Sequence, residues 1–113
     1  MTNEINTNSQ HVGIVHVDDK GIILNESEIN FIFILSDLYN IKNFKIRYKL
    51  LSTIDLYGDT IFNRLQSNIL IKELEDLLKE KIGNRTKKDI ISSIYFIKKS
   101  LKNLHTYIKF IGD

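Results

Sequence analysis

The stretch that decides the fold runs from residue 60 to residue 82 and reads TIFNRLQSNILIKELEDLLKEKI. Its large apolar residues recur at steps of three and four, which places them on one side of an α-helix. They are Phe62, Leu65, Ile69, Leu70, Leu74, Leu77 and Leu78. Asp59 or Thr60 can cap the start of this helix, and Gly83 followed by Asn84 is typical of a helix end. We therefore predict a long helix over residues 60 to 82.

A second helix is predicted over residues 87 to 105. Thr86 restarts the chain, and the apolar residues that follow it again have helical spacing. They are Ile90, Ile94, Ile97, Leu101 and Leu104. Because the connection is short, we expect the two helices to be antiparallel neighbours.

Residues 28 to 41 fit two structures. Their apolar residues lie on several faces of a helix, and their β-branched content suits a buried strand. Ser27 can cap a helix here, and Asn40 can end it. We predict a helix, with a buried strand as the alternative.

Four segments have the pattern of β-strands. Residues 11 to 17 and 21 to 25 flank an acidic turn whose Gly21 can adopt positive φ, which predicts a β-hairpin. Residues 44 to 51 and 107 to 111 alternate apolar and polar side chains. The predicted fold is therefore α+β, with a small antiparallel sheet of about four strands packed against two long antiparallel helices.

The composition is that of one globular domain without disulfides. The 113 residues are 42% apolar and 27% charged, and none is cysteine. Residues 1 to 10 are polar and predict a disordered tail, followed by a single α+β domain over residues 11 to 113. The chain start lacks the features of a secretion signal, and no run of about eighteen apolar residues occurs. We expect a cytoplasmic protein without a membrane partner.

Charge is distributed unevenly along the chain. Residues 1 to 63 carry five basic and eight acidic side chains, a net charge of −3, whereas residues 64 to 113 carry eleven basic and six acidic ones, a net charge of +5. The C-terminal lysines alternate with acids or lie on helix faces, without the interleaved aromatic residues that are typical of nucleic-acid binders. Nucleic acid is therefore not an expected partner.

The sequence contains no recognisable catalytic or metal-binding pattern. Its five glycines form no phosphate-binding loop, and no serine has the glycine neighbours of a nucleophile. His11 and His16 are an odd number of residues apart, so on a regular strand they point to opposite faces, and His105 is remote from both in sequence. We predict no enzymatic activity, no metal and no cofactor.

One polar cluster lies at the junction between a predicted turn and the first long helix. It consists of Asp55, Tyr57, Gly58, Asp59, Asn63, Arg64 and Gln66. Paired carboxylates at such a junction can act as general acid and base. We favour a structural role, because Asp59 beside a helix start gains from the helix dipole and Asp55 can bond to its own turn. The remaining polar groups either tie the helix to the loop or face a partner.

Two segments around this cluster resemble a known family. Residues 55 to 66, DLYGDTIFNRLQ, and residues 107 to 113, YIKFIGD, resemble short bacterial proteins with the pattern D-x-YGDTxFNRLQ, a helix and a closing Y-x-x-FIGD. The predicted hairpin is also similar to the family's short strand, acidic glycine turn and second strand, whereas residues 26 to 44 match poorly. We associate this family with immunity proteins that neutralise toxins delivered between bacteria, including those of contact-dependent growth inhibition.

The resemblance implies a cytosolic protein that binds a cognate toxin domain, such as a nuclease, and occludes its active site. An acidic surface would complement the basic groove of a nuclease, although acids also serve solubility alone. The candidate partner-binding residues are Asp18, Asp19, Glu26, Glu28, Asp37 and Tyr39. Two alternatives stay open. One is a non-toxin interaction adaptor or small regulator, and the other is an enzyme or ligand-binding protein that uses Asp55, Tyr57, Asp59, Arg64 and Gln66.

Overall fold

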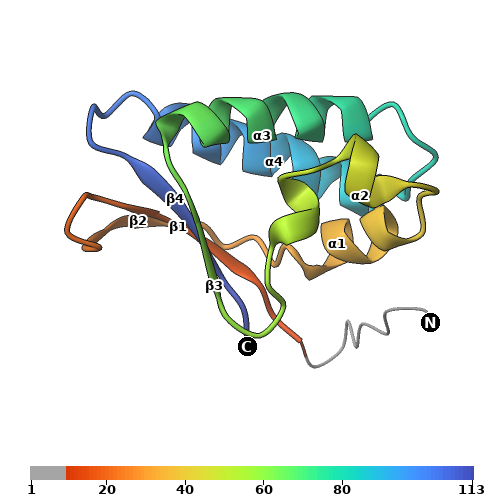
Figure 1. The fold of residues 1–113 in the computed structure, drawn as a ribbon, viewed down its shortest axis with the longest axis horizontal. Coiled ribbons are helices and arrows are strands. Elements are labelled where there is room, and N and C mark those ends of the chain that lie inside the picture. Colours follow the sequence, from red (N-terminus) through yellow and green to blue (C-terminus); the bar gives the residue numbers. More distant parts are fainter. Residues whose placement is uncertain (1–9) are drawn as a thin grey trace.

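A computed structural model describes residues 10–113, so the predicted tail lies, apart from Gln10, outside the described residues. The elements in chain order are β1 (Gly13–Val17), β2 (Ile23–Glu26), α1 (Ile32–Tyr39), α2 (Phe44–Arg47), a 3-10 helix (Leu51–Thr53), β3 (Asp59–Phe62), α3 (Arg64–Leu77), α4 (Asn84–Ser100) and β4 (Tyr107–Ile111). Figure 1 shows α3 and α4 together in a layer over the sheet, with α1 and α2 at one end of the molecule. Within this part of the chain, no helix combines the length and the apolar character needed to cross a membrane.

The strands form one antiparallel sheet in the order β2-β1-β4-β3. The last strand, β4, lies in the middle and pairs with β1 on one side and β3 on the other. Ile14 lies opposite Phe110, and Phe62 lies opposite Ile108. The predicted α+β fold is therefore confirmed, including the β1–β2 hairpin and the strand at residues 107 to 111.

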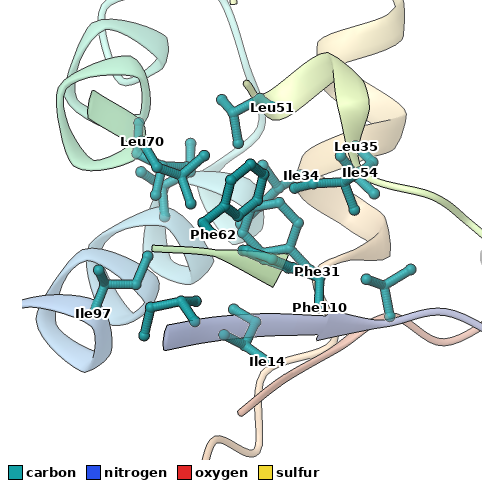
Figure 2. Packing of buried hydrophobic residues seen from close by; sticks show 14 of the residues in the cluster. Ile14, Phe31, Ile34, Leu35, Leu51, Ile54, Phe62, Leu70, Ile97 and Phe110 are labelled. Atoms are coloured by element: carbon teal, nitrogen blue, oxygen red, sulfur yellow. The ribbon is translucent and has the colours of Figure 1, made fainter. Parts of the chain in front are cut away.

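The core lies between the sheet and the helices. Phe110 of β4 is at its centre, with the ring centroids of Phe31 and Phe62 at 4.8 and 5.8 Å in edge-to-face arrangements. Figure 2 shows these rings between Leu70 on the α3 side and Ile14 on the sheet side. Such ring geometry adds to the free energy gained from burial alone. This core fixes how the helices sit on the sheet.

The ambiguous segment after β2 is a helix, as predicted, but a shorter one. Ser27 does not cap it, because α1 begins only at Ile32 and the Ser27 Oγ accepts the N–H of Ile29 at 3.0 Å. Asn30 has the positioning role instead. Its Oδ1 accepts the N–H of Ile32 at 3.1 Å and that of Val12 at 3.0 Å, which ties the start of α1 to the start of β1.

The strand predicted over residues 44 to 51 is wrong. The segment forms α2 and then leads into the 3-10 helix. Phe44, Tyr48 and Leu51 are spaced by four and three residues, so the same letters also fit a helical face, and Tyr48 and Leu51 are buried. Ile46, which a strand would bury beside Phe44 and Tyr48, is 70% exposed.

One carboxylate of α3, Glu73, and one from the turn after it, Glu80, hold this segment in place. Glu73 accepts the N–H of Leu51 at 3.0 Å, and Glu80 accepts the hydroxyl of Tyr48 at 2.9 Å and pairs with Arg47. Burial, reinforced by the bond to Glu80, raises the pKa of Tyr48 to about 12. A strand over residues 44 to 51 that paired with the sheet would not make these contacts with Glu73 and Glu80.

The strand that completes the sheet is β3, in a region predicted as a turn and a helix start. Neither Asp59 nor Thr60 caps α3. Asn63 is the cap, because its Oδ1 accepts the N–H of Gln66 at 2.8 Å while the Gln66 Oε1 accepts the N–H of Asn63 at 3.0 Å. This reciprocal capping box starts the helix four residues later than predicted, and it frees Asp59–Phe62 to pair with β4.

The other helix boundaries also differ from the prediction. α3 ends at Leu77, and α4 covers residues 84 to 100 where residues 87 to 105 were predicted. Gly83 is the N-cap of α4 with φ −68°, so it is not a left-handed C-cap. Three residues of the predicted apolar stripes lie outside the core: Leu65, Ile69 and Leu104 are 72, 45 and 84% exposed.

Candidate functional site

The two segments that carry the motif lie side by side in the sheet. β3 pairs with β4, with Asp59 opposite Ile111 and Phe62 opposite Ile108. Residues 55 to 62 and 107 to 113 are therefore neighbours in space, although α3 and α4 separate them in sequence. We call the residues Asp55, Tyr57, Gly58, Asp59, Asn63, Arg64 and Gln66 the motif cluster.

Asp55 organises the loop before β3. Its Oδ1 accepts the N–H of Tyr57 at 2.8 Å, and its own N–H donates to the Oγ1 of Thr60 at 2.9 Å. The first bond is that of an Asx turn, in which a carboxylate replaces a backbone acceptor. The Tyr57 side chain points outward and is 70% exposed. The carboxylate that an enzyme would use is thus engaged in shaping its own loop.

The residues after β4 close against this loop. Gly112 donates its N–H to the carbonyl oxygen of Gly58 at 2.8 Å, and Asp113 donates its N–H to that of Leu56 at 3.0 Å. A Cβ on Gly112 would lie 2.5 Å from the carbonyl carbon and oxygen of Leu56, so only glycine fits. The Asp113 carboxylate in turn accepts the N–H of His11 at 2.6 Å.

The other polar side chains of the motif cluster each contact a different partner. The Asp59 carboxylate lies 3.2 Å from the Nζ of Lys109 across the β3–β4 pair. The Arg64 guanidinium donates to the carbonyl oxygen of Asn103, which links the start of α3 to the chain after α4. Asn63 and Gln66 form the capping box. The contacts of the cluster are therefore directed into the fold and not toward a common point.

The depressions beside the motif cluster are small. One of about 230 Å³ lies between Asn63 and Arg64 on one side and residues 104 to 107 on the other. Another of about 230 Å³ lies beside Gly112 and Asp113. Sites that bury a small-molecule ligand usually measure roughly 300–1,000 Å³. These depressions fall below that range.

Four of the candidate partner-binding acids gather on the β1–β2 hairpin. Asp18 and Asp19 form its turn, Glu26 ends β2 and Glu28 follows it. The Asp18 Oδ1 accepts the N–H groups of Ile22 and Lys20, each at 2.9 Å, and the bond from Ile22 is the main cause of its lowered pKa. Asp18 therefore shapes the turn, whereas Asp19, Glu26 and Glu28 are exposed.

The other two candidates, Asp37 and Tyr39, lie elsewhere. Both are on α1, which Figure 1 shows at the opposite end of the molecule from the hairpin turn. The Asp37 carboxylate accepts the N–H of Gly83 at 3.4 Å. Tyr39 packs its ring 5.0 Å from that of Phe44, and burial raises its pKa. The structure therefore does not bring these two residues to the four acids of the hairpin.

Sequence reasoning missed the apolar part of the hairpin. Ile22, Ile23 and Leu24 are 57, 47 and 51% exposed, because β2 is an edge strand. Their sequence pattern indicated a strand but could not show that every residue of β2 is exposed. We define the hairpin surface as Asp19, Ile22, Ile23, Leu24, Glu26 and Glu28.

A second exposed surface lies on α4 and on the turn that follows it, which contains Lys102. Its outward side chains follow helical spacing along one face, with apolar residues in the middle and lysines toward both ends. We define the α4 surface as Lys87, Lys88, Ile91, Tyr95, Lys98, Lys99 and Lys102. Ile91 and Tyr95 are 58 and 68% exposed. Five of the eleven basic side chains of residues 64 to 113 thus lie on this surface.

His16 is buried, in contrast to exposed His11 and His105. Its Nε2 lies 3.1 Å from the Oγ1 of Thr106, whose hydroxyl has the carbonyl oxygens of Ser100 and Asn103 as acceptors. Because that hydroxyl proton is directed to a carbonyl, we assign the proton of the His16–Thr106 bond to Nε2. Burial lowers the pKa of His16. Among residues 10–113, no three His, Asp or Glu side chains are placed to hold a metal ion.

Comparison of the chain with protein-family models, with curated proteins and with solved structures yields no match.

Proposed function

We propose that this chain is an immunity-type inhibitor, a cytoplasmic protein that binds a toxin domain delivered between bacteria and occludes its active site through the hairpin surface. The observation that carries the proposal is the hairpin surface itself, where three exposed apolar side chains lie among exposed carboxylates. Apolar area drives association, and charge selects the partner and speeds the encounter. The resemblance of the motif segments to the immunity-associated family supports the same function.

The charge of the hairpin surface favours a basic partner. Asp19, Glu26 and Glu28 are opposed only by Lys20 on this hairpin, and Asp18 adds a further negative charge. A nuclease toxin has a positively charged groove for its substrate, so an acidic protrusion with an apolar centre complements it. Figure 1 shows the turn of this hairpin at one end of the molecule, away from α1 and α2.

The two alternatives depend on other features. A non-toxin adaptor or regulator would use the same hairpin surface but a different partner. An enzyme would need Asp55, Asp59 and Arg64 to act on a substrate, yet these groups form the bonds to Tyr57, Lys109 and Asn103 described above. Because these side chains of the motif cluster already bond within the chain, we favour a binding function over catalysis.

Copurification tests the proposed function. The chain is coexpressed with the product of the neighbouring reading frame, and we expect a one-to-one complex with nanomolar or tighter affinity that abolishes the activity of a toxin domain. A partner without toxic activity would favour the adaptor. Loss of a catalytic activity in Asp55→Asn or Asp59→Asn with unchanged melting temperature would favour the enzyme. Absence of any stable partner would contradict the proposal.

A further inference from the structure

We infer that the hairpin surface of one copy binds the α4 surface of a second copy, so that the chain associates head to tail. The two surfaces have the same arrangement with opposite charge. On the hairpin surface, Asp19 and Glu26 flank Ile22 to Leu24, and on the α4 surface, lysines flank Ile91 and Tyr95. Both apolar centres are about half exposed or more, so each gains from being covered.

The spacing of the two surfaces also agrees. β2 spans Ile23 to Glu26, three residue steps or about 10 Å, and the turn with Asp19 extends the hairpin surface beyond its start. Ten residue steps of helix separate Lys88 from Lys98, about 15 Å. When the apolar centres meet, carboxylates of the hairpin surface can therefore lie near lysines at both ends of the α4 surface.

The neighbouring charges do not cancel this complementarity. Lys98 lies 3.9 Å from Glu75 of α3, a contact between two half-exposed groups that contributes little. Asp89, the one acid on α4, is only partly exposed and is not part of the outward face. Lys20 is the one cation on the hairpin turn.

A single copy cannot satisfy both of its own surfaces. Figure 1 shows β2 at an edge of the sheet and α4 in the helical layer above it. An acidic surface and a basic surface at separate places on one chain make a heterologous contact, in which one copy offers the hairpin and the next offers the helix. An isolated nucleic-acid strand would pair with the lysines but would leave Ile91 uncovered, which favours the second copy as the occupant.

Sedimentation equilibrium between about 5 and 500 μM tests the inference, since a contact of this size and charge should be weak. We expect the weight-average mass of the parent to rise across this range and to fall back in high salt. Asp19→Lys with Glu26→Lys, the hairpin-reversed variant, should be monomeric. Lys88→Glu with Lys99→Glu, the helix-reversed variant, should also be monomeric. Lys45→Glu with Lys49→Glu makes the same charge change away from both surfaces and should behave like the parent.

The decisive step is to mix the two variants. The hairpin-reversed variant keeps an intact α4 surface and the helix-reversed variant keeps an intact hairpin surface, so their mixture should form a one-to-one complex. Adding Tyr95→Ala to the hairpin-reversed variant alters no charge and should weaken that complex at least about tenfold, which separates a specific contact from attraction between net charges. A monomeric parent, a mixture without complex, or a complex indifferent to Tyr95→Ala would overturn the inference.

This test needs no toxin. A chain that binds its toxin but stays monomeric would refute the self-association alone. A chain that self-associates but has no toxin partner would refute the proposed function alone.

Discussion

Gly112 donates its backbone N–H to the carbonyl oxygen of Gly58, and the two residues join the segments of sequence that carry the motif. The approach is so close that a side chain on Gly112 would meet the backbone of Leu56 and Asp55 at 2.5 to 2.7 Å. The contact between these two segments is thus first of all structural. The loop before β3, the strand pair β3–β4 and the residues after β4 are fixed together there.

Gly112→Ala should therefore destabilise the fold. The added Cβ meets backbone atoms that cannot move without breaking the bonds of Gly112 and Asp113, so we expect a loss of about 1–3 kcal/mol in the free energy of unfolding. Chemical denaturation monitored by circular dichroism measures it. Gly58→Ala is the comparison and should cost less, because its Cβ would meet the Asp55 carboxylate, a side chain that can turn away with the loss of one hydrogen bond to Tyr57. Equal stability of Gly112→Ala and the parent would contradict the claim that only glycine fits at this contact.

Asn63→Ala should lower stability by about 1 kcal/mol, the usual contribution of a helix cap. The variant loses the acceptor for the N–H of Gln66 at the start of α3. Asp59→Asn is the control, and it should cost less than about 0.5 kcal/mol because its partly exposed ion pair with Lys109 contributes little. Urea midpoints decide between them. A larger loss of stability in Asp59→Asn than in Asn63→Ala would indicate that Asp59, and not Asn63, caps the helix.

Leu74→Asp should unfold the protein, since it places a carboxylate without a partner at a fully buried position of α3. The cost of several kcal/mol approaches the whole stability of a domain of this size. Leu65→Asp introduces the same change in the same predicted stripe but at a position 72% exposed, so its melting temperature should stay close to that of the parent. If both variants melted alike, the orientation of α3 would be wrong.

Stability should fall as the pH drops from 7.5 to 5.5, and His16 should be a cause. Its pKa in the folded state lies below its ordinary value of 6.5, so the unfolded chain binds the extra proton first. The contribution of neutral His16 is thus complete above pH 6.5 and is progressively lost below it. Urea unfolding at the two pH values measures the loss. It should shrink in His16→Gln and persist in His105→Gln, which changes an exposed histidine; an unchanged loss in His16→Gln would contradict this account.

The sequence patterns predicted the elements whose spacing allowed one structure. The hairpin was predicted from its β-branched segments and glycine turn, and β4 was predicted from its alternating apolar residues. α4 was predicted from its apolar stripe. Phe44, Tyr48 and Leu51 fit both a strand and a helix, and the choice was made by contacts with Glu73 and Glu80, which are 22 and 32 residues away from their partners. No local pattern contains such contacts.

Two wrong predictions, the start of the first long helix and the missing strand β3, could have been avoided from the sequence. Asn63 and Gln66 have the spacing of a capping box, which marks the start of α3 more sharply than Asp59 or Thr60. Giving that pattern priority would also have released Asp59–Phe62 to be a strand. Leu65 is exposed for a different reason: it lies five and nine residues before the buried Leu70 and Leu74, which places it on the opposite side of α3.

The candidate site was predictable only in part. The acids of the hairpin turn could be placed together because they are close in sequence, whereas Asp37 required the position of α1. The exposed Ile22, Ile23 and Leu24 follow from the place of β2 at the edge of the sheet, which is set by the pairing of β1 with the distant β4. Strand order is a long-range property that periodicity does not encode.

Titration calorimetry of the cognate toxin domain against three forms of the chain tests the central claim most directly. The parent should bind with nanomolar or tighter affinity. Asp19→Lys with Glu26→Lys should bind at least about tenfold more weakly, while Asp59→Asn, in the motif cluster, should bind like the parent. Undiminished binding by the hairpin-reversed variant would contradict the claim that this hairpin is where the partner docks.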